Sequence, residues 1–322
     1  MITIAGAGLA GLACALELAR RRAQVRVHEQ GHAPGDSSVA RFSGGMLAPW
    51  CERESAEEEV ITLGAQAADW WAGVTPVTRR GTLVVTPPRD RAELQRFTRR
   101  TRGFRLVDGD EISTLEPALA GRFAQGLFFE QEAHLDPRCA LRDLTAKVQE
   151  LGVEINYGAS APANVTLDCT GMASSIEGLR PVRGEMAILH CPDVHITRTI
   201  RLLHPRMPLY LVPRGDGHYM IGGTMIESSS TRAISLRSLS ELLGAAFALH
   251  PGFAEASVVE TGAGLRPAFA DNLPRLVWQG KTLHLNGLYR HGFLLDPAMA
   301  ARAADHLISE TSHEPDRQRA IV

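Results

Sequence analysis

The sequence predicts an α/β fold in which a nucleotide-binding domain with a parallel sheet is interrupted by a second domain with an antiparallel sheet. Three observations support this prediction. A strand, a helix and a second strand follow one another within residues 1–29. Residues 182–227 form a block of alternating strands. The chain then returns through a strand over 282–287 to a closing helix over 297–307, as expected when one domain is inserted into another.

Strands and helices alternate in the first half of the chain. A strand over 2–5 and a helix over 9–22 lead into the alternating strand 23–29, which ends at Glu29. We predict a helix over 54–73, because its three early acids would complement the helix dipole. The remaining predicted elements are hairpin strands within 78–88, helices over 90–101 and 137–151, and a strand over 153–157.

The second half begins with a strand over 164–171 and then becomes rich in alternating strands. Strands over 185–191, 209–214 and 218–226 are predicted, with a tight hairpin turn at "RGDG" between the last two. A helix over 235–249 and a strand over 257–267 follow. We assign residues 1–75, 131–180 and 261–310 to the nucleotide-binding domain, 76–130 and 181–260 to the substrate domain, and 311–322 to a loose tail.

The composition is that of an ordinary globular protein. The 322 residues carry a net charge of -2 with mixed signs, which gives no basic field for nucleic acid and no polybasic membrane patch. No apolar run is long enough to cross a bilayer. The five cysteines are scattered without a C-x-x-C pair, and the first strand follows Met1 directly. We therefore expect a cytoplasmic protein with reduced thiols that binds neither nucleic acid nor membranes.

The turn after the first strand carries a dinucleotide-binding fingerprint. Gly6, Gly8 and Gly11 form G-x-G-x-x-G between a strand and a helix. They suit a tight turn, a close approach of the backbone to a pyrophosphate, and close packing of helix against strand. Glu29, at the end of the second strand, can accept hydrogen bonds from ribose hydroxyls. The motif does not distinguish NAD from FAD, and a glycine-rich turn without a ligand is the alternative.

Two later stretches favour FAD. In "DSSVARFSGGMLAPWCE", small residues and the pair Gly44 and Gly45 would let the backbone lie against a flat, bulky cofactor. A flexible glycine-serine loop is an equal alternative for this stretch alone. In "RHGFLLDPAMA", a helix begins after a glycine, and its N-terminus could stabilise negative charge that develops on a reduced flavin.

Arg290 raises the question of an anionic partner. Its neighbours from Leu288 to Leu295 are mostly apolar, and a guanidinium in such surroundings costs several kcal/mol unless an anion meets it. The apolar neighbours leave few protein partners, so we expect a functional role in which Arg290 meets an anion. Taken singly, two further residues fit purely structural roles as well as functional ones. Arg266 could form an ion pair with a carboxylate such as Asp271, and Tyr210 could be a core tyrosine with one satisfied hydroxyl.

Five stretches together resemble a known family. "AGAGLAGLACALELARRRAQVRVHE", "SGGMLAPWCE", "YLVPRGDGHYMIGGTM", "GAGLRPAFADNLP" and "NGLYRHGFLLDPAMA" occur in this order. They resemble the D-amino-acid-oxidase family of FAD enzymes, and within it the glycine oxidases of the ThiO type. The resemblance spans nearly the whole chain, and "LRP" followed by "YRHGFLL" is its most specific part. A D-amino-acid-oxidase-like fold with a Rossmann-like FAD-binding domain is therefore expected.

The resemblance implies roles for individual residues. Arg266 would bind the substrate carboxylate, Tyr210 would hydrogen-bond to it, and Arg290 would lie beside it as a second arginine. The expected FAD contacts are Gly6, Gly8, Leu9, Ala10, Gly11, Glu29, Gln30, Val39, Ala40, Gly44, Gly45, Met46, Leu288, Tyr289, Arg290, His291, Gly292, Phe293 and Leu294. We expect no metal, and read His291 as a structural residue rather than a base.

The resemblance also implies an activity. FAD would oxidise glycine or another small amino acid by hydride transfer from the α-carbon to flavin N5, with O2 giving H2O2 and the imine or glyoxylate serving the thiazole of thiamine. The alternatives are a D-amino acid dehydrogenase with another electron acceptor, and an inactive FAD-binding module. The family's tetramers suggest a homo-oligomer.

Two features depart from the family. The region 158–164 is shorter than in larger members, and Asp296 stands where a small residue is expected. Asp296 would either cap the closing helix or place negative charge near the flavin and lower its potential.

Overall fold

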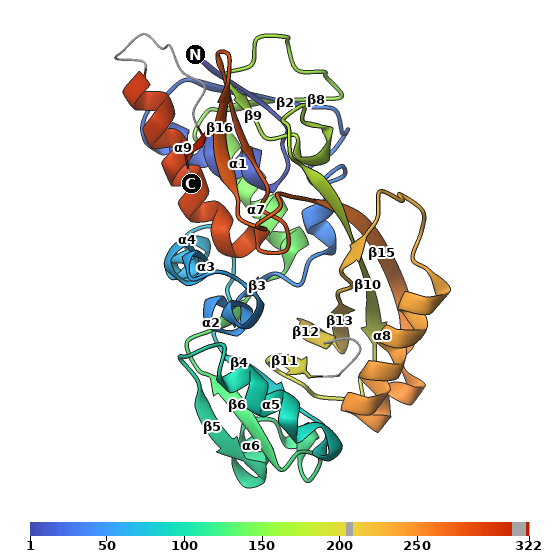
Figure 1. Ribbon diagram of the computed structural model, residues 1–322. Helices are drawn as coiled ribbons and strands as arrows, with labels where there is room; N and C mark the ends of the chain where they lie inside the picture. The colour runs from blue at the N-terminus through green and yellow to red at the C-terminus, as the bar shows by residue number, and fades with distance from the viewer. Residues whose placement is uncertain (204–208, 311–319, 322) are drawn as a thin grey trace.

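The computed structural model describes residues 1–203, 209–310 and 320–321, and these form two large sheets with helices packed around them. Figure 1 shows the first sheet in the upper part of the molecule and the second running through the lower part. The predicted tail 311–322 lies outside the described residues, apart from the short strand β18 (Ala320–Ile321).

The first sheet has a parallel centre. Its described strands follow the order β18-β16-β17-β9-β1-β2-β8. Five of them run parallel, and β16 pairs antiparallel with both β17 and β18. The bounds are β1 (Ile2–Ala5), β2 (Val25–Glu29), β8 (Glu154–Tyr157), β9 (Leu167–Asp168), β16 (Arg275–Gln279) and β17 (Thr282–Asn286). Segments from the start, middle and end of the chain thus share one sheet, as the interrupted fold predicts.

Helices with apolar faces cover this sheet. The helix α1 (Leu9–Arg20) packs on α7 (Pro137–Glu150) and α9 (Gly292–Glu310). The short helices α3 (Glu59–Gly64) and α4 (Ala67–Ala72) also pack on α9. Leucine, alanine and valine side chains from these helices and from the strands form one buried core, and their burial is the main favourable term for this domain.

The second sheet is longer and mostly antiparallel. Nine described strands contribute, in the order β14-β10-β13-β12-β11-β4-β6-β5, with β15 on the outer side of β10. The exception is β4, which pairs parallel with β11. The bounds are β4 (Thr82–Val85), β5 (Arg105–Asp108), β6 (Gln125–Phe129), β10 (Arg180–His190), β11 (Thr199–Leu202), β12 (Leu209–Gly215), β13 (His218–Gly222), β14 (Ile226–Glu227) and β15 (Ser257–Ala268).

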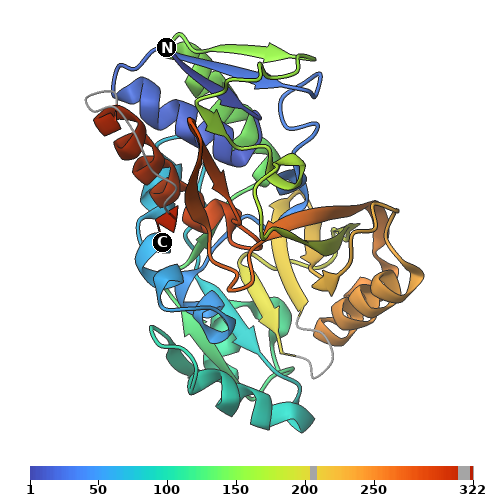
Figure 2. The same ribbon diagram turned by 45° about the horizontal axis from the view of Figure 1, so that its top comes forward.

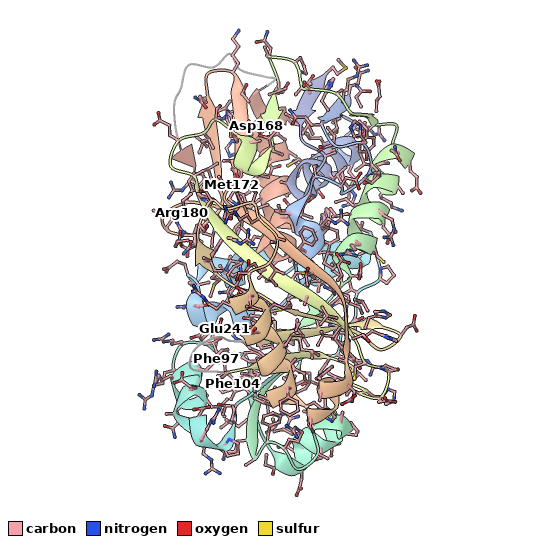
Figure 3. The ribbon with its side chains drawn as sticks, turned by 90° about the vertical axis from the view of Figure 1, so that its right-hand side faces the viewer. Phe97, Phe104, Asp168, Met172, Arg180 and Glu241 are labelled. Carbon is pink, nitrogen blue, oxygen red and sulfur yellow. The ribbon has the colours of Figure 1, made fainter. Side chains whose placement is uncertain are left out.

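Helices also flank the second sheet. α8 (Leu236–Leu249) packs on β10, whereas α5 (Arg91–Thr98) and α6 (Gly109–Leu115) lie at the other end, as Figures 1 and 2 show. A small aromatic core beside α5 joins Phe97 and Phe104 to Phe129, with ring centroids 6.3 and 5.8 Å from that of Phe129. Figure 3 shows Phe97 and Phe104 near each other in this part of the molecule.

The connection between the sheets places a short helix at their junction. The strand β3 (Met46–Leu47) pairs antiparallel with β7 (Ala133–His134), and α2 (Pro49–Glu52) follows at once. The proline at the first position of α2 suits a helix start, because that residue needs no N–H partner.

Three predicted elements differ from the structure. The helix predicted over 54–73 is wrong, because the chain breaks into α3 and α4, and a side chain at Gly64 would collide with Leu294. The hairpin predicted within 78–88 is also wrong, since β4 pairs with the distant strands β6 and β11. The closing helix begins at Gly292 instead of residue 297. Strands β5, β6 and β16 and the short strands β3 and β7 were not predicted from the sequence.

Pro297 lies inside α9 because another residue replaces its missing hydrogen bond. Proline has no N–H to donate to the carbonyl four residues earlier, here Phe293. The indole Nε1–H of Trp71 donates to that carbonyl at 2.8 Å, and the Trp71 and Phe293 rings are in contact. The interaction fastens α4 to the start of α9.

We predict that Trp71→Phe lowers the free energy of unfolding by about 1–3 kcal/mol, because it leaves the buried Phe293 carbonyl without a donor. The measurement is chemical denaturation followed by circular dichroism. Trp70→Phe is the matched control, since Trp70 donates instead to the Glu17 carboxylate. Equal losses in the two variants would contradict the assignment.

Candidate active site

The turn after β1 has the geometry of a dinucleotide-binding turn. Gly6 has φ +93°, and a Cβ there would lie 2.8 Å from the Cys169 carbonyl oxygen. A Cβ on Gly11 would lie 1.8 Å from the Gly6 oxygen, so only glycine lets α1 approach β1 this closely. A Cβ on Gly8 would meet only the Ser38 side chain, at 3.5 Å or more. The space above Gly8 therefore suits a pyrophosphate.

The N-terminus of α1 and the end of β2 fit the two ends of an ADP group. No side chain caps the helix at Gly8, and no acid lies in its first turn, so its N–H groups can bind phosphate. The Glu29 carboxylate accepts from the Ala7 and Gly31 N–H groups, both at 2.7 Å, and from the Ser37 hydroxyl at 2.9 Å. These bonds fix the carboxylate next to the turn, where it can accept from ribose hydroxyls. The residues present fit FAD.

The loop over 39–46 has its own packing reasons for glycine. Gly45 has φ +64°, and a Cβ there would lie 2.2 Å from the Leu135 oxygen. A Cβ on Gly44 would contact Met46 and Val212. The Arg214 guanidinium donates to the carbonyls of residues 43 and 44, which holds the loop in place. Contact of Val39, Ala40, Gly44, Gly45 and Met46 with the cofactor remains a prediction.

The segment 288–294 divides into a turn and a helix start. Tyr289 has φ +50°, unusual for a residue with a side chain, and its N–H bonds to the Pro267 carbonyl at 3.0 Å. Phe293 and Leu294 are buried in the core against Trp71 and Gly64. The side chains of Phe293 and Leu294 therefore belong to the core, and contact of the segment 288–294 with the cofactor stays a prediction.

The anion that meets Arg290 in the structure is Glu52. Arg290 Nη2 donates to Glu52 Oε2 at 2.5 Å and to the Tyr210 hydroxyl oxygen at 3.2 Å. The Tyr210 hydroxyl donates to Glu52 Oε1 at 2.8 Å. The sequence neighbours of Arg290 left few protein partners, but α2, far away in the chain, supplies one carboxylate. Tyr210 and Arg290 do lie together, as predicted.

These contacts fix the charge states of the group. Burial raises the pKa of Glu52, but the charges of Arg290 and Arg201 and the hydrogen bond from Tyr210 outweigh it and hold that pKa at about 2. Burial lowers the pKa of His291 to about 4, so the ring is neutral at pH 7. Its Nδ1 lies 3.4 Å from Glu52 Oε2. His291 is a buried neutral neighbour, in keeping with its predicted structural role.

Arg266 differs from Arg290 in its partners. Its Nη1 donates to the Thr224 carbonyl at 2.9 Å, and within residues 1–203 and 209–310 no carboxylate lies at ion-pair distance from it. Asp271, the structural partner considered from the sequence, pairs with Arg275 instead. Burial and the charge of Arg290 lower the pKa of Arg266 to about 10, which leaves the guanidinium charged at neutral pH.

Glycines make the space for the Arg266 guanidinium. A Cβ on Gly184 would lie 2.2 Å from its Cζ, and one on Gly223 would lie 3.2 Å from its Nη2. Gly222, the residue before Gly223, pairs with Tyr210 across β12 and β13. The second sheet therefore brings Arg266 to the side of the Tyr210 and Arg290 group.

Glu52 is the site residue that sequence reasoning missed. It ends the stretch "SGGMLAPWCE", in which the sequence predicted cofactor contacts at Gly44, Gly45 and Met46 only. A signal was available, because an acid that follows Pro49, Trp50 and Cys51 lies in apolar company, as Arg290 does. Buried opposite charges in a protein usually pair. The Met225 sulfur accepts from Arg290 Nη1 at 3.2 Å, so Met225 also borders this group.

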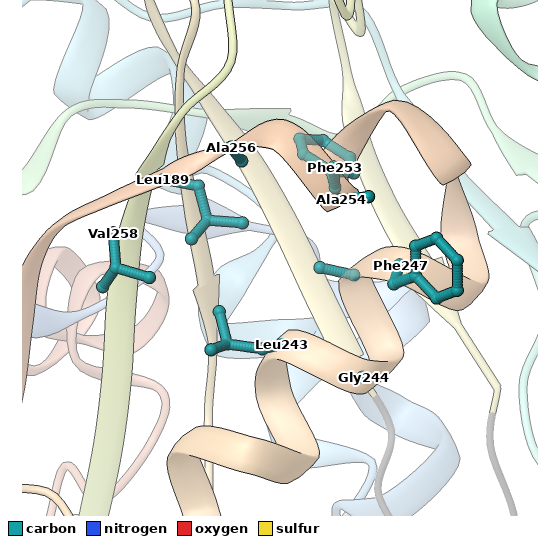
Figure 4. A pocket seen from close by; sticks show the side chains of 9 residues that line it. Leu189, Leu243, Gly244, Phe247, Phe253, Ala254, Ala256 and Val258 are labelled. Atoms are coloured by element: carbon teal, nitrogen blue, oxygen red, sulfur yellow. The ribbon is translucent and has the colours of Figure 1, made fainter.

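A groove away from the Arg266 and Arg290 group is unsuited to binding an amino acid. It has a volume of about 420 Å³ and lies between α8 and the segment that leads into β15 (Figure 4). None of the residues that line it is charged or polar, so it offers nothing to bind an ammonium or a carboxylate. The lining residues are Leu189, Leu243, Gly244, Ala246, Phe247, Phe253, Ala254, Ala256 and Val258.

Asp296 neither caps α9 nor carries a charge at neutral pH. It is the fifth residue of the helix, fully buried, and neither carboxyl oxygen has a hydrogen-bond partner among the described residues. Burial raises its pKa to about 8. Capping is therefore wrong as an explanation, and the protonated acid supplies no negative charge to a flavin at pH 7.

Comparison with known proteins gives the family. Residues 1–306 match the family model DAO, FAD dependent oxidoreductase. The chain belongs to this family and is an FAD-dependent oxidoreductase, as its dinucleotide turn and its two sheets indicate. No helix within the described part of the chain is long and apolar enough to cross a membrane.

Individual relatives place the chain within the family near glycine oxidases. A Rhizobium etli protein with the provisional name thiamine biosynthesis oxidoreductase ThiO is 52% identical, over 98% of this chain and 99% of its own length. The glycine oxidase of Pseudomonas putida is 27% identical, over 98% and 95%. The structure of glycine oxidase from Geobacillus kaustophilus superposes with a TM-score of 0.79 at 19% identity, covering 99% of this chain and 96% of that one.

We predict that Asp296→Asn becomes progressively more stable than the wild type as pH rises from 4 to 8. The folded pKa of Asp296, about 8, lies above the unfolded value of about 3.9. Between these values the native state binds a proton that the unfolded state lacks, so wild-type stability falls as pH rises, by at most about 1.4 kcal/mol per pH unit.

Denaturant unfolding of both proteins across this pH range measures the difference. Asp305→Asn is the matched control, because Asp305 lies on the same helix with an exposed carboxylate, and its difference from wild type should stay nearly flat. A constant difference for Asp296→Asn would show that the buried carboxyl has an ordinary pKa.

Proposed function

We propose that this protein oxidises glycine or another small amino acid to the corresponding imine, with FAD as cofactor and O2 as the final electron acceptor. The observation that carries the proposal is the half-buried Arg266 guanidinium, which has no carboxylate partner within the described chain and lies on the side of the group formed by Tyr210 and Arg290. A cation partly withdrawn from water without an anion is costly. A substrate carboxylate would offset that cost.

Each residue of the group has a role in this proposal. Arg266 holds the substrate carboxylate with charge-assisted hydrogen bonds, since its Nη2 and Nε are not bonded to described residues. Tyr210 lies next to that position, and its hydroxyl is oriented by Glu52 and Arg290. Two parallel hydrogen bonds from Arg266 to one carboxylate would fix the α-carbon as well as bind it, and position is most of what the reaction requires of the protein.

The described residues offer no general base at the group. Glu52 is ionised, but Arg290 and Tyr210 occupy it, and its pKa of about 2 makes it a weak proton acceptor. His291 is neutral with a pKa of about 4. We infer that the amine reacts in its neutral form: its lone pair forms the C=N bond, the α-hydrogen leaves as hydride, and an N–H proton passes to solvent. FAD, when bound, accepts the hydride and passes two electrons to O2 to give H2O2.

The relatives support the substrate class. The 52% identical relative carries a name from thiamine biosynthesis, and the 27% identical relative is a glycine oxidase. We therefore propose that the glycine imine, or the glyoxylate formed by its hydrolysis, serves the thiazole of thiamine.

The test of the reaction is anaerobic addition of glycine, sarcosine or D-alanine to the purified holoenzyme. The proposal expects the flavin absorbance near 450 nm to bleach with at least one of them, and one H2O2 to form per imine when air is admitted. Bleaching without peroxide would identify a dehydrogenase with another acceptor. No bleaching with any small amino acid would indicate an inactive FAD-binding module.

We predict that Arg266→Gln weakens binding of glycolate, a non-oxidisable glycine mimic, by about 100-fold or more, because hydrogen bonds to a charged partner contribute about 1.5–3 kcal/mol each. The measurement is a titration of the flavin spectrum. Arg275→Gln is the matched control, since Arg275 follows Arg266 on the next strand but pairs with Asp271, and it should bind glycolate like the wild type. Unchanged glycolate affinity in Arg266→Gln would remove Arg266 from the site.

A further inference from the structure

The group around Arg290 has an unusual charge balance for a site proposed to bind an anion. Two guanidiniums, Arg266 and Arg290, and one carboxylate, Glu52, lie together, whereas His291 is neutral. Their formal charges sum to a single positive charge. Arg201, the next guanidinium, stacks on the Tyr210 ring at 4.9 Å and is paired with Glu54, so it adds no free cation.

Glu52 occupies the position on Arg290 that an external carboxylate would take. It is buried, and its two oxygens accept from Arg290 Nη2 and from the Tyr210 hydroxyl. The other terminal nitrogen of Arg290 donates to the Met225 sulfur. The Arg290 charge is therefore neutralised by a protein carboxylate before any ligand arrives, although its Nη1 has only the weakly accepting Met225 sulfur, whereas Arg266 has no carboxylate partner among the described residues.

We propose that Glu52 is a specificity-determining residue that restricts the site to substrates with one carboxylate. This inference rests on the proposed function, since it concerns which amino acids that site accepts. One carboxylate neutralises Arg266. For a second carboxylate on the same ligand, the remaining guanidinium of the group, Arg290, is already paired with Glu52, so that carboxylate would have to displace Glu52 or lie against its negative charge.

A pair of ligands tests the proposal without any mutation. Iminodiacetate is a glycine whose nitrogen carries a second carboxymethyl group, and its monoamide has nearly the same size with one carboxylate fewer. Anaerobic calorimetric titration of the wild-type holoenzyme with its flavin reduced by dithionite, so that neither ligand can be oxidised, is expected to show that the monoamide binds at least tenfold more tightly than iminodiacetate. Equal affinities, or tighter binding of iminodiacetate, would overturn the proposal.

Variants of Glu52 give the second test. Glu52→Gln keeps the shape and removes the charge, so Arg290 becomes available and the ratio of the two affinities is expected to move by at least tenfold toward iminodiacetate. Glu52→Asp, which keeps the charge, is expected to retain the wild-type preference. Glu58→Gln is the control for net charge, because Glu58 pairs with Arg53 and lies at the surface, and it should leave the ratio unchanged.

A merely structural role for Glu52 makes a different prediction. Both ligands would then bind more weakly to Glu52→Gln by the same factor, and the ratio would not move, which would overturn the proposal. If Glu52→Gln does not fold, the wild-type ligand pair still decides the question. Because the assay measures binding, absence of amine oxidation would remove the proposed function, while the affinity ratio would still report on Glu52.

Discussion

The buried ion pair between Glu52 and Arg290 is the interaction on which the site depends. It joins α2 to the turn before α9, and the Tyr210 hydroxyl ties β12 to both partners. Removal of one partner would leave a buried charge unpaired, which typically costs 3–5 kcal/mol. The pair and the Tyr210 hydroxyl therefore hold three distant segments in one arrangement.

Arg266, unlike Arg290, has no carboxylate partner for its charge among the described residues. The chain places glycines at 184 and 223 so that the guanidinium fits, and gives it a carbonyl partner but no carboxylate among the described residues. Such a cation destabilises the folded protein unless a ligand compensates. A paired arginine beside an unpaired one is therefore the feature that separates the structural part of the site from its binding part.

The two-sheet architecture explains how these side chains meet the nucleotide turn. β10 and β15 extend from the first sheet toward α8, as Figure 1 shows, and Arg266 lies near the end of β15. The bond from the Tyr289 N–H to the Pro267 carbonyl then joins that end to the turn that precedes α9. The Leu9 side chain reaches Gly292, the first residue of α9, so the dinucleotide turn lies at the same junction.

The sequence by itself determined the nucleotide-binding unit, the antiparallel block and the hairpin at residues 214–217, because local periodicity and glycine spacing carry these features. The grouping of Tyr210 with Arg290 was implied by the resemblance to the D-amino-acid-oxidase family and not by a local pattern. Only the tertiary structure decided that Glu52 meets Arg290, that β4 pairs with β6 and β11, and that Trp71 allows Pro297 inside α9. Each of these depends on contacts between residues more than 40 positions apart. Such contacts arise from the global packing of apolar surface and the pairing of buried charge, which no local pattern specifies.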